Sequence, residues 1–202
     1  MNEEIKTSPR SPEEDAALIR AFQAGKKAVF DELVLRHKDK LFNLCYRFLG
    51  DYQDANDSAQ ETFIKVYRSL KKFRFESTFS TWLYRIAVNT CKNKLKSSEY
   101  RHRKKMVRLD NPGKSEGAAD SIEIRDETQS PLVELEKKER LMLIQNAIDS
   151  LPTEKKTVVV LCDIEGLSYE EIAHITGYGL GTVKSKLARA RLDLRKKLRG
   201  VI

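Results

Sequence analysis

Cysteine is scarce in this sequence. The 202 residues include three, Cys45, Cys91 and Cys162, and none belongs to a C-x-x-C pair. An odd number of widely spaced cysteines, in a chain that begins without a secretory leader, argues against a disulfide framework. Each cysteine lies among apolar residues, so we expect buried thiols that act as small hydrophobic side chains.

Clustered histidines and long apolar runs are missing too. His37, His102 and His174 are scattered, so we expect no metal site, no other cofactor and no catalytic residues. No apolar stretch approaches the roughly 20 residues that span a membrane. The polar, acidic N-terminus is unlike a signal or transit peptide. We therefore expect a reduced, cytoplasmic protein.

Sustained period-two alternation, which would indicate strands, is also absent. Apolar residues recur instead at helical spacing through residues 12–96. Ser11 before Pro12 suits the start of a first helix, and Gly50 suits the end of a second. Ser80 suits the N-cap of a fourth. The pattern predicts an all-α fold.

The composition changes between two helical blocks. Residues 97–130 have few large apolar side chains and no sustained period, so we predict a flexible linker there. Residues 1–11 have the composition of a disordered tail. The predicted organisation is therefore a tail, a first small helical domain at 12–96, the linker, and a second helical domain at 131–202.

Positive charge is what the sequence has in excess. The formal net charge is +8, which by itself is weak evidence for a polyanionic partner. The excess is concentrated from Lys184 to Arg199, where eight Lys or Arg accompany one acid, Asp193. Such a segment suits contacts to phosphates, although an isolated basic helix is more often only solvated.

The residues just before this basic segment predict a helix-turn-helix. Ser168 and Glu171 have the S-x-x-E spacing of a capping box at the start of a short helix. Gly177 suits a turn that needs a positive φ, and a second helix would start near Leu180. A small residue at Ala173, a turn glycine and an aliphatic residue below the second helix match the motif's spacing.

The second helix of this motif divides into two faces at about 100° per residue. The inward stripe is apolar, from Val183 to Leu198, and Leu192 on the outward face is a misfit. Small outward residues let a helix approach the floor of the major groove, where lysine and arginine side chains can reach guanine edges. The candidate residues are Thr182, Lys184, Ser185, Ala188 and Arg189.

Two stretches of the first domain are unusual. Acidic and amide side chains crowd the first half of the third helix, outside its apolar stripe: Asp54, Asp57, Gln60 and Glu61. Acids near a helix N-terminus can simply stabilise the helix, or they can form a docking face for a basic partner. Both interpretations remain open at this point.

The second unusual stretch, residues 73–94, interleaves aromatic residues with bases and amides. Stacking groups beside cations suit single-stranded nucleic acid with unstacked bases. The candidates are Phe73, Trp82, Asn89 and Lys92. Trp82 is more typical of a core residue, whereas Phe73 and Asn89 favour a binding role.

Four stretches together resemble a known family: DANDSAQETFIKVYRSL, FSTWLYRIAVNTCKNKL, GLSYEEIAHI and LGTVKSKLARAR. They are similar, in order, to the diagnostic segments of the extracytoplasmic-function (ECF) group of bacterial sigma-70 factors. The resemblance implies a sigma-2 domain, a linker and a sigma-4 domain. It implies a non-catalytic subunit that binds core RNA polymerase and directs transcription from specific promoters.

The resemblance also implies roles for the candidate residues. The acidic set on the third helix falls where the family docks on the β′ clamp helices, and a further contact to the β flap is expected. The aromatic stretch falls where a flipped base of the −10 non-template strand is captured, and the outward face falls where the −35 element is read. An anti-sigma factor is a common further partner, sometimes one that holds the sigma factor at the inner membrane.

Two positions depart from the family pattern. Ala188 stands where a bulkier residue is usual, and Asn56 stands where Glu is frequent. Two other classes of protein compete with this interpretation. A response regulator would share the helix-turn-helix but needs an α/β receiver pattern, which residues 12–96 lack. An RNA-binding regulator is disfavoured because A-form RNA hides its major groove.

Overall fold

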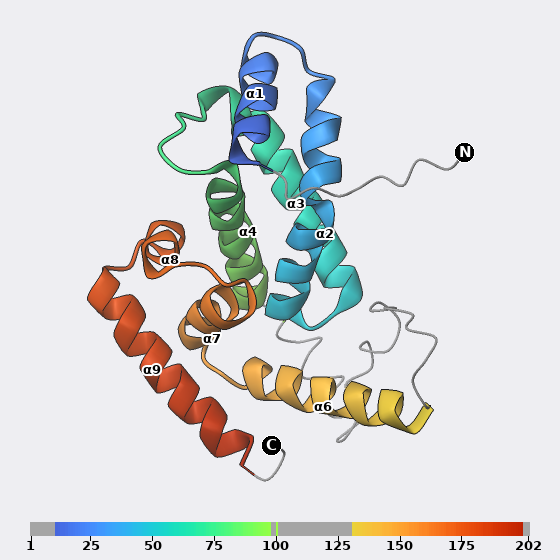
Figure 1. Cartoon of the computed structure of the whole chain (residues 1–202), viewed down its shortest axis with the longest axis vertical. Helices are drawn as coiled ribbons and strands as arrows, with labels where there is room; N and C mark the ends of the chain where they lie inside the picture. The colour runs from blue at the N-terminus through green and yellow to red at the C-terminus, as the bar shows by residue number, and fades with distance from the viewer. Residues whose placement is uncertain (1–10, 98–99, 101–130, 200–202) are drawn as a thin grey trace.

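The computed structural model describes residues 11–97, residue 100 and residues 131–199, with the backbone alone for 131–138. In these residues all regular structure is helical, as predicted (Figure 1). The predicted tail up to residue 10 and most of the predicted linker lie outside the described residues. No helix in the described part is long and apolar enough to cross a membrane.

The first domain is a bundle of four α-helices with a short 3₁₀ turn, η1, between the third and the fourth. Helix α2 packs against α1, α3 and α4, and so forms the middle of the bundle (Figure 1). The elements are α1 (Pro12–Gln23), α2 (Val29–Leu49), α3 (Tyr52–Ser69), η1 (Leu70–Lys72) and α4 (Phe79–Lys96).

The second domain begins with a long helix and ends with another. Between them lie two shorter helices and a single π-helical turn, η2. Helix α9 runs along the outer edge of the molecule and packs on α7 and α8 (Figure 1). The elements are α6 (Pro131–Asp149), α7 (Thr153–Val159), η2 (Val160–Ile164), α8 (Tyr169–Thr176) and α9 (Leu180–Lys197).

Helix ends follow the local sequence signals at most positions. The Ser11 side chain caps α1 by accepting from the Glu14 amide, and Gly50 ends α2 in the left-handed region at φ 70°. The prediction of Ser80 as the cap of α4 is wrong. Thr78 is the N-cap, and its Oγ1 accepts from the Thr81 amide, so the helix begins two residues earlier than predicted.

The core of the first domain is a layer of aliphatic and aromatic side chains between the helices. Leu33, Leu41 and Leu44 of α2 are fully buried. Replacing one of them with alanine typically costs 2–5 kcal/mol. At the far end of the bundle the rings of Phe30 and Tyr67 meet edge to face, with centroids 5.0 Å apart.

Two details differ from the expectations above. Tyr100, within the predicted linker, is 7% exposed and donates from its hydroxyl to the Leu49 carbonyl at 2.8 Å, so it packs on the first domain. Cys45 and Cys91 are buried as expected, whereas Cys162 is only partly buried. Burial raises the pKa of the Cys162 thiol, which keeps it protonated.

The two domains lie side by side. Helix α8 packs against α4, and α6 and η2 reach the C-terminal end of α2 (Figure 1). The first helix of the helix-turn-helix therefore covers one side of the helix that carries the aromatic and amide candidates.

Candidate nucleic-acid interface

Helices α8 and α9 form the predicted helix-turn-helix. Ser168 accepts from the Glu171 amide, and the Glu171 side chain accepts from the Ser168 amide, so the capping box is complete. Gly177 ends α8 at φ 74°, a conformation that favours glycine, and α9 begins at Leu180. The geometry confirms the motif inferred from the residue spacing.

Helix α9 has one buried and one exposed face, as the angular analysis predicted. Val183, Leu187 and Ala190 are at most 1% exposed. Leu192, the misfit, is 51% exposed on the opposite side. All five residues of the candidate reading face are exposed to solvent: Thr182, Lys184, Ser185, Ala188 and Arg189. A helix with this face can enter a major groove without rearranging its own domain.

The basic residues of α9 are not equivalent, which the sequence could not show. Lys186 forms an ion pair with Glu154. Arg191 donates to both oxygens of Asp163 at 2.5 and 3.2 Å, and this hydrogen bonding raises the pKa of its guanidinium further. These two side chains are paired with acids of their own domain, so fewer of the eight basic residues are available to phosphates than the count suggested.

Lys196 is exposed on the last turn of α9 and provides a test of phosphate contact. We expect Lys196→Ala to weaken binding to every duplex alike and to reduce the slope of log affinity against log salt by about 0.9. The measurement is a fluorescence-anisotropy titration at several salt concentrations. The control is Lys186→Ala, whose lysine is paired with Glu154; an unchanged slope for Lys196→Ala would rule out the contact.

The aromatic candidates of the first domain form a cluster around the start of α4. Phe73 is 7% exposed, and its ring lies 5.0 Å from those of Phe75 and Trp82. Trp82 is half-buried and Phe75 is 38% exposed, with a positive φ of 59°. The sequence favoured Phe73 for direct binding, but its burial leaves it better placed to support its neighbours.

Asn89 and Lys92 lie further along α4. Asn89 is exposed, as a base-contacting residue must be. Lys92 is half-buried, with its Nζ 5.6 Å from the centre of the Tyr178 ring in the turn of the helix-turn-helix. Burial lowers the pKa of Lys92. In this arrangement the second domain thus covers one of the predicted residues.

The four acidic and amide candidates on α3 differ in exposure. Asp57, Gln60 and Glu61 are exposed, but Asp54 is 2% exposed and pairs with Lys94 of α4 at 2.9 Å. The four residues, which lie outside the apolar stripe in the sequence pattern, therefore do not form one exposed face, because Asp54 is buried. Its carboxylate joins α3 to α4, and only the other three can meet a partner directly.

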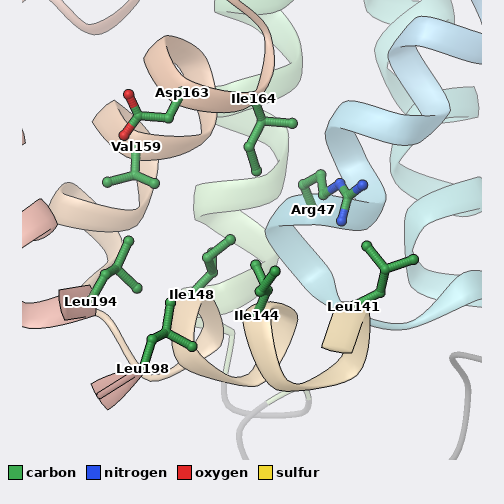
Figure 2. Close-up of a pocket in the computed structure, with 9 residues that line it drawn as sticks. All are labelled: Arg47, Leu141, Ile144, Ile148, Val159, Asp163, Ile164, Leu194 and Leu198. Atoms are coloured by element: carbon green, nitrogen blue, oxygen red, sulfur yellow. The ribbon is translucent and has the colours of Figure 1, made fainter. Parts of the chain in front are cut away.

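A shallow apolar groove of about 300 Å³ lies between α6, η2 and the end of α9, and Figure 2 shows its lining. Ile144, Ile148 and Leu194 form much of its floor, with Arg47 of the first domain at one side and Asp163 at the other. The sequence did not predict this groove, because its residues come from four separate segments.

Comparison with known proteins decides the family. The sigma-70 region 2 family matches residues 33–101, and the sigma-70 region 4 family matches residues 141–194. The RNA polymerase sigma-H factor of Pseudomonas aeruginosa is 40% identical over 197 residues, covering 94% of this chain and 96% of the relative. The chain belongs to the ECF group of sigma-70 factors.

Other relatives support the same family assignment. The ECF RNA polymerase sigma-E factor of Haemophilus influenzae is 39% identical over 184 residues, covering 91% of this chain and 95% of that protein. Among solved structures, CnrH in complex with the cytosolic domain of CnrY matches with a TM-score of 0.63 and 24% identity, over 91% of this chain and 96% of CnrH. That structural likeness supports the fold of this sigma factor.

Membership of the family establishes the general function. This sigma factor directs promoter-specific transcription initiation, with region 2 binding the −10 element and region 4 the −35 element. It is a non-catalytic subunit of RNA polymerase.

Proposed function

We propose that α9 reads the −35 element through Lys184, Ser185, Ala188 and Arg189, with Thr182 at the edge of the site. The observation that carries this proposal is that the whole face is exposed while the opposite face is buried. Ala188 leaves space beside Arg189, so the long guanidinium can extend to a guanine edge. Exposed basic side chains on the last turn of the helix, such as Lys196, then contact the phosphates.

We propose that α4 captures the −10 non-template strand. Asn89 is an exposed amide on this helix, and Trp82 is half-buried with its ring next to Phe73. The aromatic cluster gives a rigid support, against which an unstacked base can be held while an amide reads its edge. Lys92 lies one turn further along and supplies charge for the backbone once Tyr178 has moved away.

Asn89→Ala tests the −10 assignment. We expect open-complex formation on duplex promoters to fall roughly 10- to 100-fold, because a base-reading contact is worth about 1–3 kcal/mol. The loss should be confined to one non-template base, measured by permanganate footprinting on promoters substituted at each −10 position. Asn146→Ala, at an exposed asparagine of α6, is the control. An unchanged base preference would remove Asn89 from the site.

We propose that two surfaces of the protein contact core polymerase. We define the acidic patch as Asp57, Gln60 and Glu61 on α3, and we propose that it docks on the β′ clamp helices, with Asp54 fixing α3 through Lys94. The apolar groove beside α6 is proposed to take an apolar helix of the β flap, since its floor is aliphatic and its rim carries opposite charges.

An anti-sigma factor is a further proposed partner. One structural neighbour is the sigma factor RpoE in complex with the anti-sigma factor NepR from Bartonella quintana, and another, CnrH, is in complex with the cytosolic domain of CnrY. Such a partner would hold this sigma factor away from polymerase, in the cytoplasm or at the inner membrane.

A run-off transcription assay tests the proposed function as a whole. Purified protein is mixed with core polymerase and DNA fragments carrying candidate promoters. We expect transcripts of defined length that need both protein and promoter. A repressor-type helix-turn-helix protein would give none, and that result would contradict the proposal.

A further inference from the structure

The loop of residues 73–78, between η1 and α4, carries an aromatic side chain that none of the proposed contacts uses. Phe75 is 38% exposed, and its φ of 59° is the only positive value among the described residues other than glycine. A bulky side chain rarely adopts this left-handed backbone, because its Cβ crowds the following carbonyl. Such a conformation persists only where surrounding contacts fix it, and it is concentrated at ligand-binding sites.

Helix α1 supplies contacts that fix this loop, which lies beside it in Figure 1. Gln23, at the end of α1, donates from Nε2 to two main-chain oxygens, that of Leu70 at 3.2 Å and that of Phe73 at 2.9 Å. One side-chain amide therefore holds both ends of the η1 turn. Because the second carbonyl lies two residues before Phe75, Gln23 sets where the loop leaves the bundle.

Two neighbours orient the Phe75 ring itself. The Phe73 ring meets it at 66° with centroids 5.0 Å apart, and the guanidinium carbon of Arg20 on α1 lies 5.2 Å from its centroid. Phe73 in turn lies 5.0 Å from the Trp82 ring. Tilted aromatic and cation–π contacts orient a ring without enclosing it. Phe75 is thus a fixed, partly exposed extension of the aromatic cluster at the start of α4.

The surroundings of Phe75 are basic. Four exposed cations lie on the loop, on η1 and on the last turn of α1: Arg74, Lys71, Lys72 and Arg20. Glu76 is the only acid in residues 70–79, and it stands 4.0 Å from Arg74 with both side chains more than 70% exposed. A pair so exposed is weak, which leaves Arg74 free to meet another anion. An exposed ring among cations suits single-stranded nucleic acid, which offers bases for stacking and phosphates for charge.

We propose that Phe75 is a second base-stacking site for the non-template strand, and that Gln23 is the residue that positions it. The inference rests on the proposed −10 role of α4, because it extends the same strand-binding surface beyond Asn89. An unstacked base lies against the exposed part of the Phe75 ring, and Arg20 and Arg74 meet the phosphates beside it. Every base has a π-face, so this contact tolerates any sequence. Phe75 adds affinity for the opened strand and leaves the choice of base to Asn89.

Phe75→Gly removes the ring without straining the chain, because glycine adopts a φ of 59° readily. We expect the affinity of the full-length protein for single-stranded dA and dT oligonucleotides of about 12 nucleotides to fall roughly 5- to 100-fold on both. Fluorescence anisotropy measures this loss. The melting temperature should stay close to that of the wild type, since relief of the backbone offsets the lost ring contacts. Phe75→Tyr keeps the ring and should bind like the wild type.

Two controls separate stacking from charge and from exposure alone. Tyr52→Leu removes a ring that is 50% exposed at the start of α3, away from the loop, and it should leave single-strand binding unchanged. A duplex of the same length should bind the wild type and Phe75→Gly equally, because paired bases keep their faces within the stack.

Gln23→Met tests the positioning role. Methionine has a similar length, no charge and no donor, so the Leu70 and Phe73 carbonyls lose their partner. We expect single-strand affinity to fall roughly 3- to 10-fold. Combined with Phe75→Gly, the same change should cause no further loss, since the loop then has no ring to misplace. A purely structural role of Gln23 would weaken binding equally in both backgrounds.

The outcomes keep the two proposals apart. Unchanged affinity of Phe75→Gly for both oligonucleotides would overturn the stacking site, and so would an equal loss on duplex DNA. Weaker co-purification of Phe75→Gly with core polymerase, with single-strand binding intact, would show that the ring meets protein instead. Absence of run-off transcription by the wild type would overturn the proposed function and leave the oligonucleotide comparison standing.

Discussion

The double substitution Asp57→Lys with Glu61→Lys is expected to abolish co-purification with core polymerase. Both side chains are more than half exposed on the acidic patch of α3. Two new positive charges would face the surface that the acidic patch is proposed to meet, and placing like charges together costs several kcal/mol. A loss of more than about a hundredfold in affinity follows.

The fold should survive this change, because both carboxylates are more than half exposed and their ion pairs, Glu61 with Lys65 and Asp57 with Lys94, contribute little. Circular dichroism and thermal melting check this. The matched control is Asp31→Lys with Asp39→Lys, the same change of charge at two exposed acids of α2. Normal affinity of the Asp57/Glu61 variant for core polymerase would show that the acidic patch only stabilises its own helix.

Arg189→Ala is expected to relax discrimination at a single −35 base pair by roughly 1–3 kcal/mol, or about 10- to 100-fold. Arg189 is exposed on the face of α9 that enters the groove, beside the small Ala188. A bidentate contact to guanine carries sequence information that alanine cannot replace. The measurement is competition binding against a set of duplexes that differ at each −35 position.

Arg191→Ala is the matched control, on the same helix two residues away. Its guanidinium is held by Asp163, so its loss should leave −35 discrimination unchanged, and because the Arg191 side chain is 53% exposed we expect at most a small loss of stability. Equal weakening on every sequence by Arg189→Ala would show that Arg189 contacts phosphate and reads no base.

The helix-turn-helix could be predicted because each of its signals is local. The capping box at Ser168, the positive φ of Gly177 and the two faces of α9 depend on residues a few positions apart. Short-range geometry of this kind is encoded in spacing alone. The all-helical fold was predictable for the same reason.

Features that depend on distant segments were missed. The burial of Asp54 requires Lys94, which is 40 residues away on the next helix. The pairing of Lys186 with Glu154 requires α7 to lie beside α9. A residue count along one helix cannot show which charges a neighbouring helix neutralises, so the sequence overestimated both the acidic patch and the basic face.

The contact between the domains is a further property of the tertiary structure. Lys156 lies within the short helix α7, and nothing in the neighbouring sequence indicates that its Nζ will donate a hydrogen bond to a carbonyl 108 residues earlier. Tyr84 and Glu165 are separated by 81 residues. These contacts became visible only when the packing of α6, α7 and η2 on the first domain was known.

The most direct test is to sequence the 5′ ends of transcripts that core polymerase makes with this protein on genomic DNA. The account predicts start sites that share one −35 motif and one −10 motif at fixed spacing. Arg189→Ala should alter the upstream motif alone, and Asn89→Ala the downstream motif alone. Start sites without a shared pair of motifs, or variants that change both motifs together, would contradict the assignment of one promoter element to each domain.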